Sequence, residues 1–280
     1  MASEALPGQI LLSAQITVRY AGKPPVLDNV RLEIRRGEVL GLVGQSGSGK
    51  SSMAMAILGL LDKKASQAQG EIRFQNVDLL QLSERELRDL RGRAISLVLQ
   101  SPMSSLNPAL KIRTQLREAW RAHASGTRSD CESVIKAALQ SVSLPADDDF
   151  LRKRPAQMSV GQAQRVLIAM AVMHRPALLI ADEATSALDV ITQCEILALF
   201  RELNRSTGMS ILYISHDLGS VAGICDRIAI LHHGEIVECG ATSQIFSNPQ
   251  HEYTQRLMAA VPRLPAVAQL QGKAEAAASR

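Results

Sequence analysis

The sequence predicts an α/β fold built on a parallel β-sheet, and three observations lead to this prediction. Short runs made almost entirely of apolar residues recur along the chain, which is typical of strands covered on both faces. Segments with the apolar spacing of helices separate these runs, and this alternation builds parallel sheets. Near the N-terminus apolar and polar residues instead alternate one by one, which indicates half-buried strands. We therefore expect a parallel core sheet and an N-terminal antiparallel β-layer.

The antiparallel layer is predicted from two segments. In residues 10–20 the even positions are apolar up to Tyr20, and most odd positions are polar. Residues 30–35 alternate in the same way between apolar and charged side chains. A proline-containing turn at residues 23–25 separates the two segments, so we expect them to pair as antiparallel strands.

The core strands are predicted at apolar runs, the first of which leads directly into a glycine-rich turn. These runs are residues 39–43, 95–99, 178–181 and 211–214. Between the second and third run, residues 104–160 contain no strand-like segment and carry helix-forming stretches at 114–124 and 131–142. We expect a helical subdomain inserted at about residues 104–165.

The remaining predictions concern a hairpin, a short acidic run and the domain boundaries. Residues 227–232 and 235–239 flank a His-Gly turn, which predicts a hairpin. The acidic run 147–149 is interpreted as a solvated turn. One domain is expected over residues 1–262, and residues 263–280 are expected to form a flexible tail.

Composition narrows the class of protein. Hydrophobic residues make up 46% of the 280 residues and charged residues 21%, which excludes disordered and collagen-like chains. Aromatic residues are only 3%, which counts against proteins that bind single strands by stacking, and we expect no nucleic-acid partner. The net charge of +4 does not select a partner. The apolar runs are shorter than the ~18 residues that span a bilayer, and the N-terminus lacks the pattern of a secretory signal, so a cytoplasmic location is expected.

The four cysteines suggest no site of their own. They are scattered without CxxC spacing, which argues against a zinc site or a disulfide framework, and we expect all of them to be buried as small apolar residues. They are Cys131, Cys194, Cys225 and Cys239.

A phosphate-binding motif follows the first core strand. The pattern GxxxxGK[ST] is carried by Gly44, Gln45, Ser46, Gly47, Ser48, Gly49, Lys50 and Ser51, with Ser52 after it. Small residues let main-chain N–H groups curl around phosphate oxygens, and the helix that follows adds its positive dipole. Lys50 is expected to reach the β- and γ-phosphates of a nucleotide, and the Ser51 hydroxyl to bind Mg²⁺.

Two carboxylates end the apolar run at residues 178–181. Strand ends of parallel sheets are where ligands bind, so Asp182 and Glu183 can face the same nucleotide. We expect Asp182 to hold Mg²⁺ and Glu183 to orient or deprotonate the attacking water. A strand that ends in Asp-Glu is equally typical of a solvated turn, and it is the phosphate motif in the same chain that favours the catalytic interpretation.

From about residue 10 to 262 the chain resembles the nucleotide-binding subunit of ATP-binding cassette (ABC) transporters, because further motifs of that family occur in the family's order. Tyr20 lies where the family has an aromatic residue that stacks on adenine. Gln100 matches the Q-loop glutamine, which contacts Mg²⁺ and the water. His216 matches the switch histidine that contacts the γ-phosphate. The resemblance implies a P-loop NTPase of the ABC type that binds ATP and Mg²⁺ and hydrolyses ATP.

Two more motifs imply a second ATPase chain. Residues 158–162 match the LSGGQ signature, from which Ser159, Gly161 and Gln162 are expected to bind the γ-phosphate held by the partner ATPase. Residues 186–189 match the D-loop, and Asp189 is expected at the same shared site. The partner is a second copy or a different cassette.

The chain departs from the family pattern at two positions. Val160 stands where the signature has its first glycine, which brings a β-branched side chain to the phosphate-facing turn. Ala184 stands where a proline usually follows the catalytic glutamate, so the turn loses rigidity but no chemical group. We expect the valine to weaken closure of the two ATPase chains or to slow turnover.

Two segments resemble one importer subfamily. Residues 100–108 are similar to the segment after the Q-loop in importers of dipeptides, oligopeptides and nickel, and residues 251–257 with 261–262 are similar to their C-terminal segment. The resemblance implies two membrane permease subunits, an extracytoplasmic substrate-binding protein and a peripheral position on the cytoplasmic face of the cell membrane, the inner membrane where there are two. Because no cysteine follows Cys239, we expect no iron–sulfur tail, which favours a compact form as in nickel or metal-chelate members.

Other functions remain open at this point. A soluble ABC ATPase of DNA repair or translation usually has tandem cassettes or long coiled coils, which this chain lacks. An accessory ATPase of carbon–phosphorus bond cleavage resembles the same subfamily and would have a partner enzyme in place of a permease. His232, His233 and His251 could suggest nickel ligands, but the ATPase subunit does not line the transport path.

Overall fold

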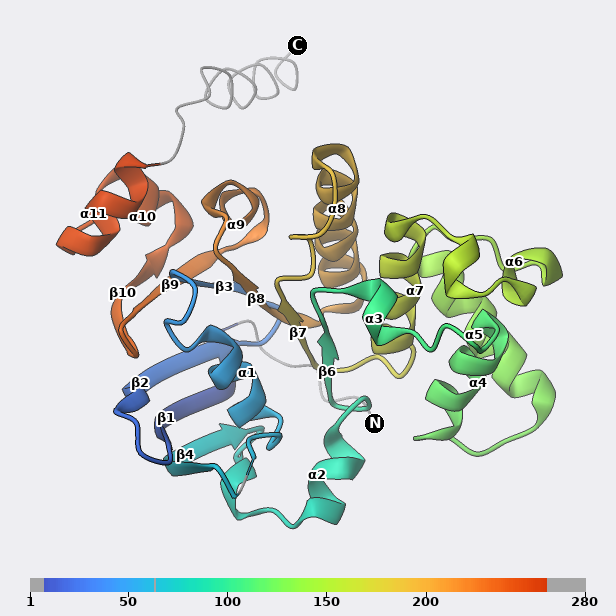
Figure 1. The fold of residues 1–280 in the computed structure, drawn as a ribbon, viewed down its shortest axis with the longest axis horizontal. Helices are drawn as coiled ribbons and strands as arrows, with labels where there is room; N and C mark the ends of the chain where they lie inside the picture. Colours follow the sequence, from blue (N-terminus) through green and yellow to red (C-terminus); the bar gives the residue numbers. More distant parts are fainter. Residues whose placement is uncertain (1–7, 63, 261–280) are drawn as a thin grey trace.

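Two sheets and a group of helices form the molecule in the computed structural model, which describes residues 8–62 and 64–260 (Figure 1). The first sheet has the order β2-β1-β4-β5 and is antiparallel throughout. The second has the order β10-β9-β3-β8-β7-β6, and within it β10 alone is antiparallel to its neighbour. The expected parallel core sheet with an N-terminal antiparallel layer is confirmed.

The antiparallel layer contains a strand that the sequence pattern did not predict. β1 (Ile10–Tyr20) pairs with β2 (Pro25–Arg35) as expected, but it also pairs along its length with β4 (Ser66–Phe74). The first residues of β4 are mostly polar and exposed, so nothing in their own pattern marks a strand, and pairing with β1 supplies the missing information. The short β5 (Val77–Asp78) completes the layer.

The core strands lie where the apolar runs predict them. All residues of β3 (Val39–Val43), β7 (Leu178–Asp182) and β8 (Ser210–Ser215) are buried, which explains their continuous apolar character. β6 (Ile95–Val98) forms the edge of the sheet beside β7. The predicted hairpin is present as the other edge, where β9 and β10 occupy Arg227–His232 and Glu235–Ala241.

Most helices lie either beside the core sheet or in one group between β6 and β7. That group, α3 to α7, is drawn in green to yellow at the right of Figure 1 and packs around apolar residues such as Leu116, Ile135 and Val166. The helices and 3₁₀ turns are α1 Lys50–Ile57, η1 Leu79–Gln81, α2 Glu84–Leu90, α3 Pro102–Ser105, α4 Ile112–Arg121, α5 Arg128–Ser141, α6 Asp148–Arg152, η2 Pro155–Gln157, α7 Val160–Val172, α8 Val190–Thr207, α9 Leu218–Ile224, α10 Thr242–Ser247 and α11 Glu252–Ala259.

Two local predictions are wrong. The acidic run 147–149 is exposed to solvent as expected, but it is not a turn, because the Asp147 carboxylate accepts the N–H of Phe150 and caps helix α6. Cys131 and Cys225 are buried as expected, but Cys194 and Cys239 are exposed. The latter two lie on α8 and on the edge strand β10, where one face of the element points outward.

Two further expectations concern the ends and the membrane. The flexible tail predicted at residues 263–280 lies outside the described residues. Within the part of the chain that the structure describes, no helix combines the length and the apolar character needed to cross a bilayer.

Candidate functional site

Four neighbouring strands bring the expected site residues together at one end of the core sheet, the end at which the parallel strands finish. β3, β8, β7 and β6 are adjacent and parallel, so their carboxyl ends lie side by side. The segments that follow these strands carry the glycine-rich loop, His216, Glu183 and Gln100 in turn. The arrangement is the one in which open α/β sheets bind ligands.

The glycine-rich loop between β3 and α1 has a backbone that other residues would not adopt freely. Gly47 and Gly49 have φ values of 81° and 109°. A Cβ on Gly44 would lie 2.2 Å from the carbonyl oxygen of Leu231, so this position must also be glycine. The loop ends at α1, whose first residue is the buried Lys50.

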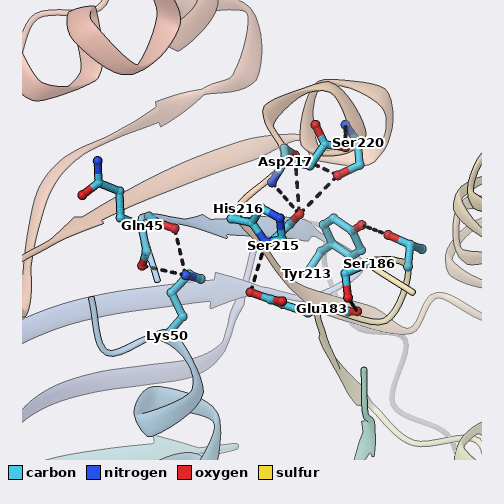
Figure 2. A network of polar contacts seen from close by, with 11 residues as sticks. Gln45, Lys50, Glu183, Ser186, Tyr213, Ser215, His216, Asp217 and Ser220 are labelled. Atoms are coloured by element: carbon cyan, nitrogen blue, oxygen red, sulfur yellow. Dashed lines mark hydrogen bonds and ion pairs between the residues drawn. The ribbon is translucent and has the colours of Figure 1, made fainter. Parts of the chain in front are cut away.

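Main-chain carbonyl groups of the loop hold the Lys50 side chain in place. Its Nζ donates hydrogen bonds to the carbonyl oxygens of Gly44, at 2.8 Å, and Gln45, at 3.0 Å (Figure 2). Burial lowers the pKa of Lys50, while the charges of Glu183 and Asp182 raise it. The ammonium group therefore lies close to both carboxylates at the end of β7, Asp182 and Glu183.

Asp182 is a buried carboxylate with an unused oxygen. Its Oδ1 is buried and has no hydrogen-bond partner among the described residues. Burial raises the pKa of Asp182, and an interaction with the Ser51 hydroxyl opposes that rise. A buried charge of this kind is stable only when something pairs with it, and a cation would do so.

The oxygen ligands available at this edge fit Mg²⁺. This ion prefers oxygen and is usually bound through one or two carboxylates together with substrate phosphates and water. Asp182 and Ser51 supply protein oxygens, and Gln100 follows the neighbouring strand with an exposed side chain. Among the described residues, no three or more His, Cys, Asp and Glu side chains form a cluster that could hold a metal ion.

Glu183 and His216 face each other across the ends of β7 and β8. The Glu183 Oε1 lies 3.2 Å from Nδ1 of His216 (Figure 2). Glu183 has a φ of 48°, which is uncommon for a residue with a side chain, and its N–H donates to the carbonyl oxygen of Ile214. Strained backbone of this kind concentrates at functional sites.

Tyr20 also lies next to the glycine-rich loop, although it comes from the other sheet. Its hydroxyl is 3.5 Å from the hydroxyl of Ser52 on α1. The structure thus brings Tyr20, Lys50, Asp182, Glu183 and His216 into one region.

The signature residues form a second, separate surface. Ser159 caps α7 by accepting the N–H of Gln162, whose side chain accepts the N–H of Ser159. A Cβ on Gly161 would lie 2.7 Å from Cγ2 of Thr192, and Thr192 is bound by Asp189, the cap of α8. Figure 1 shows α7 and α1 on different sides of β6 and β7, so the chain does not bring its own signature to its own glycine-rich loop.

Sequence reasoning missed a hydroxyl network behind Glu183 and His216. Tyr213 on β8 is fully buried, and its hydroxyl is hydrogen-bonded to Thr185 at 2.9 Å. Ser215 and Ser220 continue the network toward α9. The pattern of one sequence contains no signal for such contacts, because they join side chains on different strands.

Family models match two parts of the chain. Residues 27–186 match the model described as ABC transporter, and residues 237–279 match the model described as the C-terminal region of oligopeptide/dipeptide transporters. The first match contains the glycine-rich loop, the signature and both carboxylates at the end of β7.

Named proteins and solved structures give the same result. The chain is 42% identical to the dipeptide transport ATP-binding protein DppD of Bacillus subtilis over 88% of this chain and 73% of that protein. It is 42% identical to the glutathione import ATP-binding protein GsiA of Salmonella paratyphi A over 85% of this chain, but spans only 39% of that longer protein. The dimeric cassette MJ0796, solved with ADP and phosphate in a post-hydrolysis state, superposes with a TM-score of 0.71 at 29% identity, covering 82% of this chain and 98% of that one.

Proposed function

This chain belongs to the ABC transporter family of ATP-binding proteins, and we propose that it drives uptake of a short peptide across the membrane. It is the ATP-hydrolysing subunit of an importer. The observation that carries the proposal is the set of strand ends at one sheet edge, which places Lys50 beside two carboxylates and Glu183 beside His216.

The substrate class rests on the relatives. The protein from Bacillus subtilis is named for dipeptide transport and that from Salmonella for glutathione, which is itself a tripeptide. The match of residues 237–279 to the oligopeptide/dipeptide C-terminal region supports the same class. Nickel or a metal chelate, which the sequence also suggested, is the second candidate.

The proposed reaction is in-line attack of water on the γ-phosphate of ATP. Lys50 and the main-chain N–H groups of the loop bind the phosphates and stabilise the charge that develops on them. Glu183 orients the water and accepts its proton, while His216 positions that carboxylate and contacts the γ-phosphate. Ser51, Asp182 and Gln100 would hold Mg²⁺, which neutralises phosphate charge when bound.

The complete site is proposed to need two ATPase chains. Because α7 lies away from α1 in one chain, Ser159, Gly161, Gln162 and Asp189 would act on the nucleotide of a partner ATPase. Helix α7 has an N-terminus that can bind an anion, which suits a γ-phosphate. Two permease subunits and an extracytoplasmic binding protein would complete the importer at the cytoplasmic face of the membrane.

Copurification tests this proposal. The tagged chain would be isolated from gently solubilised membranes, and the proteins bound to it identified by mass spectrometry. Two multispanning permeases, with or without a second cassette, would support transport and reveal whether the ATPase pair is one chain or two. Recovery of soluble enzymes alone would instead favour an accessory ATPase, as in carbon–phosphorus bond cleavage.

Replacing Asp182 by Asn should separate stability from activity. Removing a buried charge whose Oδ1 has no hydrogen-bond partner among the described residues is expected to raise the unfolding temperature of the nucleotide-free protein by about 2–4 °C. The same variant should lose the extra stabilisation that MgATP gives the wild type, as well as its turnover. Thermal unfolding with and without MgATP measures both effects, and the exposed Asp28→Asn is the matched control. An Asp182→Asn protein stabilised normally by MgATP would contradict the assigned role.

Replacing Val160 by Gly should improve ATP-driven association. Val160 is the first residue of α7 and 41% exposed, so its branched side chain stands at the surface offered to the partner's phosphate. We expect Val160→Gly to raise turnover by about threefold, with Val160→Ala between the two. ATPase rates and ATP-dependent association of the purified complex are the measurements. Equal rates in all three proteins would mean that valine is accommodated without cost.

A further inference from the structure

Tyr213 links the two turns that carry Glu183 and His216. The side chain is fully buried on β8, and its hydroxyl is hydrogen-bonded at 2.9 Å to Oγ1 of Thr185, two residues after Glu183 (Figure 2). Thr185 is itself 3% exposed. A buried tyrosine hydroxyl usually has such a partner, whereas a phenylalanine would fill nearly the same volume without one. The hydroxyl is therefore the informative part of this residue.

The turn after Glu183 depends on few contacts with the sheet. Ser186 closes the turn on itself, since its N–H and Oγ both donate to the carbonyl oxygen of Glu183, at 3.1 and 3.0 Å. The N–H of Ala184 donates to no described residue. Two hydrogen bonds tie the turn to β8. The N–H of Glu183 donates to the carbonyl oxygen of Ile214, and the hydroxyls of Thr185 and Tyr213 are hydrogen-bonded to each other.

The other side of Tyr213 faces the turn that carries His216. The Ser215 hydroxyl accepts the N–H of Asp217 at 2.9 Å, and it lies 3.3 Å from the Ser220 hydroxyl. Ser220 in turn donates to the carbonyl oxygen of Asp217 at 2.8 Å. Burial raises the pKa of Tyr213, and hydrogen bonds with Ser220, Thr185 and Ser215 oppose that rise. The phenol thus stays protonated, and its hydrogen bond to Thr185 joins β8, the strand that leads into the His216 turn, to the turn that carries Glu183.

This link bears on the geometry of the proposed reaction. Glu183 has a left-handed φ, and Ala184 after it has none of the backbone restriction that a proline would supply. Without the tether at Thr185 the turn is free to relax, and the 3.2 Å contact between Glu183 and His216 would be lost for part of the time. A general base that is misplaced by a small distance loses rate and not binding.

We propose that the Tyr213 hydroxyl is a positioning group, which holds Glu183 and His216 in register through its hydrogen bond to Thr185. Tyr213 does not touch the nucleotide. It acts on the rate of the chemical step through the two turns, and this inference rests on the proposed roles of Glu183 and His216.

Turnover and affinity of hydroxyl-deletion variants test the proposal in the complete transporter complex. Tyr213→Phe and Thr185→Val each remove one side of the hydrogen bond and are expected to lower kcat by about three- to tenfold, with KM for ATP unchanged. The double variant should be no worse than either single one, because both delete the same interaction. Thr185→Ser keeps a hydroxyl and should restore most of kcat. Tyr253→Phe is the matched control, since that buried tyrosine hydroxyl on α11 has no hydrogen-bond partner among residues 8–62 and 64–260.

The outcomes are distinct. A kcat for Tyr213→Phe within twofold of the wild type would overturn the proposal, and so would an equal loss in Tyr253→Phe. If the kcat of the double variant fell by the product of the two single losses, the two hydroxyls would act separately. An effect on KM with kcat intact would mean a role in binding. Glu183→Gln is measured in parallel: full turnover in that variant would remove the proposed role of Glu183, on which this inference rests, whereas failure of Tyr213→Phe alone leaves that role standing.

Discussion

Glu183→Gln is expected to lower the turnover number for ATP by about 10²- to 10⁴-fold, the range typical for loss of a general base. Gln has nearly the shape of Glu and can still orient water, but it cannot accept a proton. Because Lys50 and the glycine-rich loop are unchanged, the affinity for ATP should stay within about threefold of the wild type. Single-turnover hydrolysis and equilibrium ATP binding separate the two quantities.

The control for this variant is Glu202→Gln, an exposed position on α8. It removes the same charge elsewhere and should leave both quantities unchanged. Turnover of Glu183→Gln within a few-fold of the wild type would mean that another group accepts the proton. His216, 3.2 Å away, would then be the next residue to test.

The sequence predicts those parts of the fold in which the polarity of each residue depends only on whether that residue is buried. The runs at β3, β7 and β8 are continuously apolar because both faces of these strands are buried, and no neighbour needs to be known to see it. β4 was missed because residues 66–70 are mostly polar and only partly buried, and their strand conformation comes from pairing with β1. Cys239 was misplaced because the edge position of β10 is a property of the sheet and not of the local pattern.

The candidate site shows the same division. The glycine-rich loop can be predicted because its chemistry needs consecutive residues. The turns with Glu183 and His216 can be located because each follows an apolar run that predicts a strand. The order of the strands, which makes these loops neighbours, cannot be predicted from any single segment of the sequence. The link from Tyr213 to Thr185 joins side chains 28 positions apart, so it becomes visible only once β7 and β8 are paired.

Lys50→Met should have the largest effect on binding. Met keeps the length and most of the apolar stem of the side chain but removes the ammonium, which is buried and bonded to the loop carbonyls of Gly44 and Gln45. Charged hydrogen bonds to phosphate are worth about 1.5–3 kcal/mol, so the affinity for ATP should fall by roughly ten- to a hundredfold.

Turnover should fall further than binding, because Lys50 also stabilises the charge that develops on the γ-phosphate as its bond breaks. The folded structure should persist, since the substitution removes a buried charge whose pKa is already lowered by burial. Nucleotide titration and thermal unfolding of Lys50→Met, beside the exposed Lys136→Met on α5, test this expectation. A variant that binds ATP like the wild type while hydrolysing it slowly would confine Lys50 to the chemical step. One that unfolds near room temperature would instead assign its main role to holding the loop.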